Sequence, residues 1–342
     1  MKSQRNMKKY IILLFFPVLL FSCKGGDKAD ISNINLTIDL MRLDKDLFNI
    51  SPDTTEIKKN LPTLREKYGS FFELYSQNII HHIGNSSSET YPAYLQSFLM
   101  DKSVQAGWQK SKEVFADDTE MIKNITIAFK HFKYYFPDKM IPKVYTYISG
   151  FGESMALADS LVGISIDKYL GADYEGYDML SFSKYLSRKM YKEKIPSDCV
   201  KAWGIGEFPF TDDGGNNLIS KMIYEGKLLY FTKMMIPNEA DTIIFGFTKN
   251  ELKWCKENEK NMWAFLIEEK LLFSTDHLTI VKMTEEAPFT SLFPPESPGR
   301  ACNWIGYQIV KRYMERNKDV TLAQLMEDNK HIRIYEKTRY KP

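Results

Sequence analysis

The sequence is poor in the two residue types that most often build cross-links and metal centres. It has 4 cysteines and 5 histidines in 342 residues. No two cysteines form a C-x-x-C pair, which excludes a zinc site of that spacing and a dense disulfide framework. None of the histidines belongs to an H-E-x-x-H motif, the zinc-peptidase signature in which two histidines share a helix face. The histidines are His81, His82, His131, His277 and His331.

A strong excess of charge is also missing. The formal net charge is +2, which gives no reason to expect a nucleic-acid partner. No internal repeat or low-complexity run interrupts the sequence. With 22 Phe and 20 Tyr, the chain has the apolar content of an ordered protein, and its length fits one large or two modest domains.

The longest apolar run lies at the N-terminus and is too short for a comfortable membrane span. It covers residues 10–21 (YIILLFFPVLLF) and follows a basic segment with Lys2, Arg5, Lys8 and Lys9. Residues 20–23 (LFSC) then have the form of a lipobox. The pattern predicts a lipoprotein signal at residues 1–22, an acylated Cys23 carrying chains such as palmitate, and a short polar tether at residues 23–30. The alternative is a plain signal peptide that happens to contain cysteine.

Three cysteines remain after such a cleavage: Cys199, Cys255 and Cys302. At most one disulfide could join them, and wide spacing favours three buried thiols that behave as small apolar side chains.

Residues 31–136 are predicted to form a helical N-terminal region. Residues 34–39 alternate like a strand, and residues 42–48 (RLDKDLF) turn into a short helix. Apolar residues at spacings of three and four predict a helix over residues 61–83. Further helices are expected over residues 91–100, 104–115 and 121–136. His81 and His82 fall at a helix end without a nearby carboxylate or cysteine, which favours a solvated end over a metal site.

From residue 137 onward, strands join the helices. Residues 144–148 and 161–166 are rich in β-branched residues and predict an antiparallel hairpin at a sheet edge. Helices follow over residues 179–191, 197–205, 249–271 and 300–316, with a proline-rich loop at 288–299. Thr321 and Gln324 have the spacing of a capping box that opens a last helix.

The segment most informative about function is residues 216–231 (NNLISKMIYEGKLLYF). Leu218, Met222, Glu225 and Leu229 follow one another at spacings of four, three and four, so they share one helix face. A carboxylate on an apolar face is costly unless it is paired, hydrogen-bonded or bound to metal. Gly226 inside the helix costs about 1 kcal/mol relative to Ala, and is tolerable where a neighbour approaches the backbone closely.

Two interpretations of Glu225 are open. A Glu-Gly pair on an inward helix face is how one class of zinc peptidases presents its third metal ligand, so the segment could be a peptidase-like scaffold that lacks its histidines. Alternatively, Glu225 is a buried carboxylate satisfied by a nearby Lys, Arg or backbone amide. Lys201 and Arg300 are the expected partners, because both lie in segments that should border the same cleft.

The order of several segments resembles the gliding motility lipoprotein family GldB of Bacteroidetes over nearly the whole mature chain. The matching segments are Cys23 with its lipobox and residues 42–48, 68–72, 135–151, 165–171, 221–231 and 297–314. The resemblance implies a membrane-anchored component needed for surface gliding and the secretion machinery linked to it, with no established reaction. The second half of the family is similar to zinc-peptidase-like (zincin) domains, from which this chain departs by lacking the histidine pair.

The sequence therefore predicts an α+β, mostly helical fold, with a zincin-like region over residues 137–342 that contains a small antiparallel sheet. We expect an envelope lipoprotein that faces the periplasm on the inner or outer membrane and binds protein partners. The candidate cleft residues are Glu225, Gly226 and Arg300, with no catalytic residue, metal or cofactor assigned. The alternative is a cell-envelope hydrolase that depends on a metal or on Glu225.

Overall fold

A computed structural model describes residues 29–81, 85–211 and 215–342. Residues 31–342 form one compact unit. The predicted signal peptide, the lipidation site Cys23 and most of the tether lie outside the described residues. The mostly helical α+β fold class is confirmed, since short strands join a long series of helices. The division of the compact unit at residue 136 stays a prediction.

The sheet has four strands in the spatial order β1-β2-β4-β3 and is mixed. β1 pairs in parallel with β2, β2 pairs in parallel with β4, and β3 pairs antiparallel with β4. The strands are β1 (Leu40–Arg42), β2 (Lys143–Tyr147), β3 (Met155–Ala158) and β4 (Leu161–Ser165). β1 comes from the predicted N-terminal region and the other three strands come from the region after residue 137.

The predicted antiparallel hairpin between residues 144–148 and 161–166 is wrong. The connection between them contains β3, which runs back along the sheet edge and lets β4 insert in parallel beside β2. β3 was missed because its sequence, MALA, is short, lacks β-branched residues and follows a glycine-rich turn. The first strand also lies later than expected, after rather than within residues 34–39.

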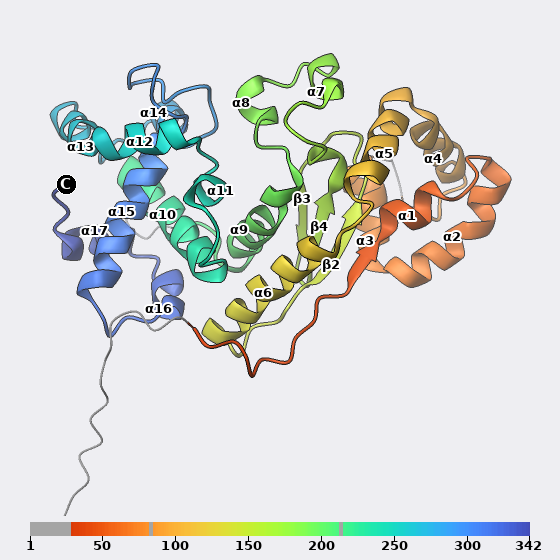
Figure 1. Cartoon of the computed structure of the whole chain (residues 1–342), viewed down its shortest axis with the longest axis horizontal. Helices are drawn as coiled ribbons and strands as arrows, with labels where there is room; N and C mark the ends of the chain where they lie inside the picture. The colour runs from red at the N-terminus through yellow and green to blue at the C-terminus, as the bar shows by residue number, and fades with distance from the viewer. Residues whose placement is uncertain (1–28, 82–84, 212–214) are drawn as a thin grey trace, which may run out of the picture. The chain divides into compact units, whose positions relative to one another are not determined.

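The N-terminal helices pack beside this sheet (Figure 1). They are α1 (Leu43–Phe48), α2 (Thr54–Tyr68), α3 (Ser70–Leu74), the π-helical η1 (Tyr75–Ile79), α4 (Tyr91–Met100), α5 (Lys102–Val114) and α6 (Thr119–Tyr135). The continuous helix expected over residues 61–83 is broken at Gly69, whose φ of +52° suits glycine. The apolar face was still predicted correctly, because Tyr68, Phe71 and Tyr75 are buried against the sheet.

The helices that follow the sheet build the larger part of the core. They are α7 (Glu175–Met179), α8 (Lys184–Ser187), α9 (Ile195–Glu207), α10 (Leu218–Met235), α11 (Asp241–Phe245), α12 (Lys249–Glu257), α13 (Glu259–Glu268), α14 (His277–Thr284), α15 (Ala301–Arg316), α16 (Leu322–Glu327) and α17 (His331–Thr338), with the 3-10 turns η2 (Ile166–Lys168) and η3 (Lys192–Lys194). The helix predicted over residues 179–191 is wrong for most of its length: only α8 lies wholly within that range, and Ser181, between α7 and α8, adopts a φ of +61°. The capping box at Thr321 and Gln324 is confirmed at the start of α16.

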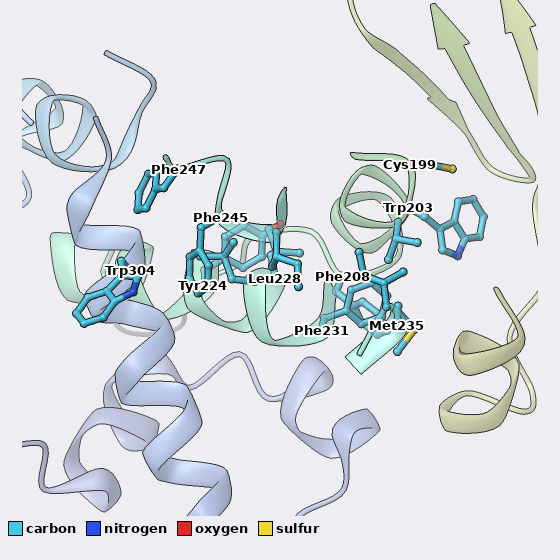
Figure 2. Packing of buried hydrophobic residues seen from close by; sticks show 14 of the residues in the cluster. Cys199, Trp203, Phe208, Tyr224, Leu228, Phe231, Met235, Phe245, Phe247 and Trp304 are labelled. Atoms are coloured by element: carbon cyan, nitrogen blue, oxygen red, sulfur yellow. The ribbon is translucent and has the colours of Figure 1, made fainter. Parts of the chain in front are cut away.

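α10 is the central helix of this core. Most of its side chains are buried, and it packs against α9 on one side and α15 on another. Figure 2 shows Phe231 and Met235 of α10 near Phe208 and Trp203, which lie in or just after α9. Because α10 is enclosed in this way, its polar residues lie among buried apolar neighbours.

Candidate functional site

The candidate site is built around Glu225 on α10. The helix starts at Asn217, whose side chain accepts a hydrogen bond from the Ser220 backbone N–H at 3.0 Å, as an N-cap should. Leu218, Met222 and Leu229 are buried on the face predicted for them, and the Glu225 side chain is only 12% exposed. The inward orientation inferred from the spacing is therefore what the structure shows.

Two lysines balance the Glu225 carboxylate. Lys201 Nζ of α9 donates to Glu225 Oε2 at 3.3 Å, and Lys221 Nζ lies 3.2 Å from Oε1. Lys201 was one of the two partners expected from the sequence. Lys221 was missed, although it precedes Glu225 by four residues on the same helix, a spacing at which side chains meet.

The charge state of Glu225 follows from these contacts. Burial raises the pKa of the carboxyl group, but the charges of Lys201, Lys221 and Arg300 outweigh burial and leave the pKa below its usual value. Glu225 is therefore an ionised acceptor near neutral pH and has no proton to donate. This is the second interpretation left open by the sequence, a buried carboxylate satisfied by nearby lysines.

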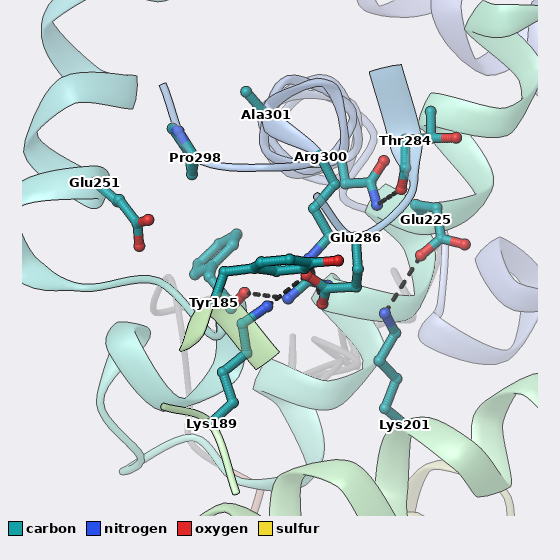
Figure 3. A network of polar contacts seen from close by, with 12 residues as sticks. Tyr185, Lys189, Lys201, Glu225, Glu251, Thr284, Glu286, Pro298, Arg300 and Ala301 are labelled. Atoms are coloured by element: carbon teal, nitrogen blue, oxygen red, sulfur yellow. Dashed lines mark hydrogen bonds and ion pairs between the residues drawn. The ribbon is translucent and has the colours of Figure 1, made fainter. Parts of the chain in front are cut away.

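Arg300 contacts a different carboxylate from the one expected. Its Nε lies 2.9 Å from Glu286 Oε1, and one of its terminal nitrogens donates to the Phe245 carbonyl at 2.8 Å. Lys189 forms a second ion pair with Glu286. Figure 3 shows Lys189 and Arg300 gathered around Glu286, with Lys201 reaching Glu225 beside them.

The backbone around Arg300 is fixed by the proline-rich loop before α15. Thr290 Oγ1 donates to the Pro298 carbonyl at 2.7 Å and accepts from the Ala301 N–H at 2.8 Å. Arg300 itself, the N-cap of α15, adopts φ +54° and ψ +35°, a left-handed conformation that residues with a side chain rarely adopt. The clamp by Thr290 holds this conformation and directs the guanidinium toward Glu286 and Phe245.

Gly226, the third candidate residue, lies at the crossing of α10 and α15. A Cβ placed on Gly226 would lie 2.3 Å from the carbonyl carbon of Gly306, and one placed on Gly306 would lie 1.8 Å from the Met222 carbonyl oxygen. Both distances are far below van der Waals contact, so the two backbones touch at these glycines. The close backbone approach expected at Gly226 is present, and its partner is α15.

The cysteines that the structure describes are buried thiols rather than exposed nucleophiles. Cys199, Cys255 and Cys302 are free and buried, and burial raises the pKa of the Cys199 thiol to about 12. Within the ranges that the structure describes, no group of three or more His, Cys, Asp or Glu side chains could hold a metal ion.

Comparison with known proteins places the chain in a family. A sequence model described as gliding motility protein GldB matches residues 24–342. The chain belongs to the GldB family. No curated protein and no solved structure matches it.

GldB membership supports a gliding-motility-associated lipoprotein of the cell envelope. Among the described residues of this GldB chain, no helix is both long and apolar enough to cross a membrane. The Glu225 and Arg300 ion pairs lie within the part of the chain that the family covers, so they belong to the GldB domain itself.

Proposed function

We propose that this chain is a lipid-anchored envelope protein that works by binding and assembly in the machinery of gliding motility and associated secretion. Acyl chains on Cys23 would hold it at the periplasmic face of the inner or outer membrane. The observation that carries the proposal is the family match, which covers residues 24–342 and begins one residue after Cys23. Everything before that point has the composition of a lipoprotein signal.

A binding role fits the chemistry of the candidate site better than a catalytic one. Glu225 is already neutralised by two lysines at 3.2–3.3 Å, an arrangement that holds a carboxylate in place. We infer that residues 137–342 are a peptidase-like scaffold whose Glu-Gly helix has no catalytic role. The inference is supported by the position of Glu225 and Gly226 on α10, most of whose side chains are buried.

Cys23→Ala is expected to release the protein from the membrane fraction of cells that express the full chain. No other cysteine lies near the end of the apolar segment, so the variant has no thiol there that could receive acyl chains. The measurement is the distribution of the protein between membrane and soluble fractions after a high-salt wash. Ser22→Ala is the matched control, because it keeps a small residue before Cys23 and should stay with the membrane.

Retention of Cys23→Ala in the washed membranes would contradict the anchor, since it would mean that the apolar segment acts as an uncleaved span. In a host that glides, the released variant should also lose surface spreading although it remains folded. Full spreading by a soluble variant would contradict assembly at the membrane.

A further inference from the structure

Four basic side chains from separate segments meet beside the candidate site, and we call them the cation cluster: Lys189, Lys201, Lys221 and Arg300. Their side chains are between 12% and 22% exposed. Each is therefore largely removed from bulk water, where a positive charge is expensive unless it is balanced.

The carboxylates beside the cation cluster do not balance it. Glu225 is as buried as the cations, with a side chain 12% exposed. Glu286 lies between Lys189 and Arg300 and is 37% exposed, whereas Glu285 lies at the rim, 55% exposed, so water screens much of the charge of Glu285. The adjacent Arg188 is already paired with Glu251 at 2.8 Å. Four cations thus face three carboxylates, and one positive charge remains unbalanced.

One helix N-terminus adds to this positive potential, because Arg300 is the N-cap of α15. A long helix presents about half a positive charge at its N-terminus. A cation at this end is the reverse of the usual stabilising arrangement, and the helix dipole raises the local surplus to about one and a half positive charges.

The cluster is also preorganised. Arg300 is held in a left-handed backbone conformation with one terminal nitrogen fixed on the Phe245 carbonyl at 2.8 Å. Its Nε is buried and meets Glu286 only at an ion-pair distance, without the angle of a hydrogen bond. Burial and the charge of Arg300 lower the pKa of Lys189 to about 8, as expected where cations repel one another.

We propose that the cation cluster binds a phosphate group that carries two negative charges. A phosphomonoester carries about −1.5 to −2 charges near neutral pH and so offsets the surplus, and its oxygens suit both a guanidinium and ammonium groups. The source is a phosphorylated small molecule or the phosphomonoester headgroup of an envelope lipid. This inference goes beyond the proposed function, because binding by the purified chain depends neither on the anchor nor on a protein partner.

The first test is binding of inorganic phosphate to the purified chain from residue 24 onward, with sodium chloride of equal ionic strength as the reference. If the dissociation constant is on the order of 1 mM, ~10 mM phosphate should raise the melting temperature by about 2–4 °C relative to chloride. Isothermal titration should show a stoichiometry of one. Equal melting temperatures in phosphate and chloride, with no heat of binding, would overturn the proposal.

Charge variants give the second test, and they predict effects of opposite sign. Lys201→Met and Lys189→Met should each weaken phosphate binding about tenfold or more, because each removes a charged donor. Glu225→Gln should tighten binding, because it enlarges the positive surplus. Lys123→Met on α6 is the control, since Lys123 is 61% exposed and pairs with Glu120 away from the cluster, and it should bind as wild type does. The same affinity in all four variants would place the phosphate elsewhere and overturn the assignment.

The source of the phosphate is resolved by vesicles. Binding to vesicles that contain phosphatidic acid, but not to phosphatidylcholine alone, would assign a lipid headgroup if Lys201→Met abolishes it. Binding of free phosphate without vesicle binding would assign a soluble phosphomonoester. Because these measurements use purified protein, they can fail while the Cys23 experiment succeeds, and the reverse also holds.

Discussion

Gly306→Ala is expected to lower the free energy of unfolding by more than about 3 kcal/mol, and Gly226→Ala by a similar amount. At Gly306 the new methyl group would lie 1.8 Å from the Met222 carbonyl oxygen, and at Gly226 it would lie 2.3 Å from a Gly306 backbone atom. Backbone atoms cannot rotate away as a side chain can, so α10 and α15 would have to separate. Both helices are enclosed in the core, and their separation would open cavities along the whole interface.

Gly206→Ala is the matched control for these variants. Gly206 lies in α9, and its new methyl group would find Leu157 Cδ1 at 3.8 Å, an ordinary contact. Its stability should be unchanged or higher by up to about 1 kcal/mol, as expected for Gly to Ala in a helix. The measurement is denaturant unfolding of the three variants beside wild type. A Gly306→Ala protein as stable as Gly206→Ala would contradict the close crossing of α10 and α15.

Glu225→Gln is expected to lower the free energy of unfolding by roughly 3 kcal/mol, the lower end of the range for breaking a buried ion pair from one side. The side chain of Glu225 is 12% exposed, and the variant leaves Lys201 and Lys221 facing each other without the carboxylate. Their 22% exposure lets water offset part of the loss, which is why the lower end applies. Glu225→Ala should be less stable still, because it also leaves a cavity.

The difference in stability between wild type and Glu225→Gln should depend on pH. The pKa of Glu225 in the folded protein lies below its ordinary value of 4.5, so its stabilising contribution is present above that pH. As pH falls through the lowered folded pKa, wild type loses this contribution, whereas Glu225→Gln has none to lose. The difference in stability between the two proteins should therefore shrink in acid.

A double variant separates the ion pair from other effects of the substitution. Lys201→Met combined with Glu225→Gln should be more stable than the sum of the two single effects predicts, because each single change strands the partner charge. Unchanged or raised melting temperatures for the Glu225 variants, together with loss of a cellular phenotype, would indicate a working active-site residue placed at a cost in stability.

The sequence was sufficient to predict the local features of this site and insufficient for its long-range contacts. Helical spacing placed Glu225 inward, and the glycine beside it indicated a close neighbour, both as found. Nothing in the sequence marks Gly306 as that neighbour, because the choice depends on how α10 and α15 cross. Arg300 was assigned to the right region and to the wrong carboxylate, because the loop that brings Glu286 to it has no periodicity to follow.

The sheet illustrates the same limit. β2 and β4 were recognised from their β-branched residues, yet their parallel pairing depends on β3, a weak edge strand whose composition does not identify it. Helix breaks at Gly69 and Ser181 were likewise hidden by an apolar pattern that continues through them. Local periodicity therefore predicted which faces are buried, while strand direction and helix ends depended on contacts between distant segments.

The most direct test of the account is elemental analysis of the purified chain from residue 24 onward, dialysed after exposure to zinc, with Glu225→Ala measured beside wild type. Lys201 and Lys221 pair with Glu225, and we infer that it serves as a structural carboxylate. We expect well under one zinc per chain in both proteins, with no difference between them. About one zinc per wild-type chain, lost in Glu225→Ala, would contradict the account and identify Glu225 as a metal ligand.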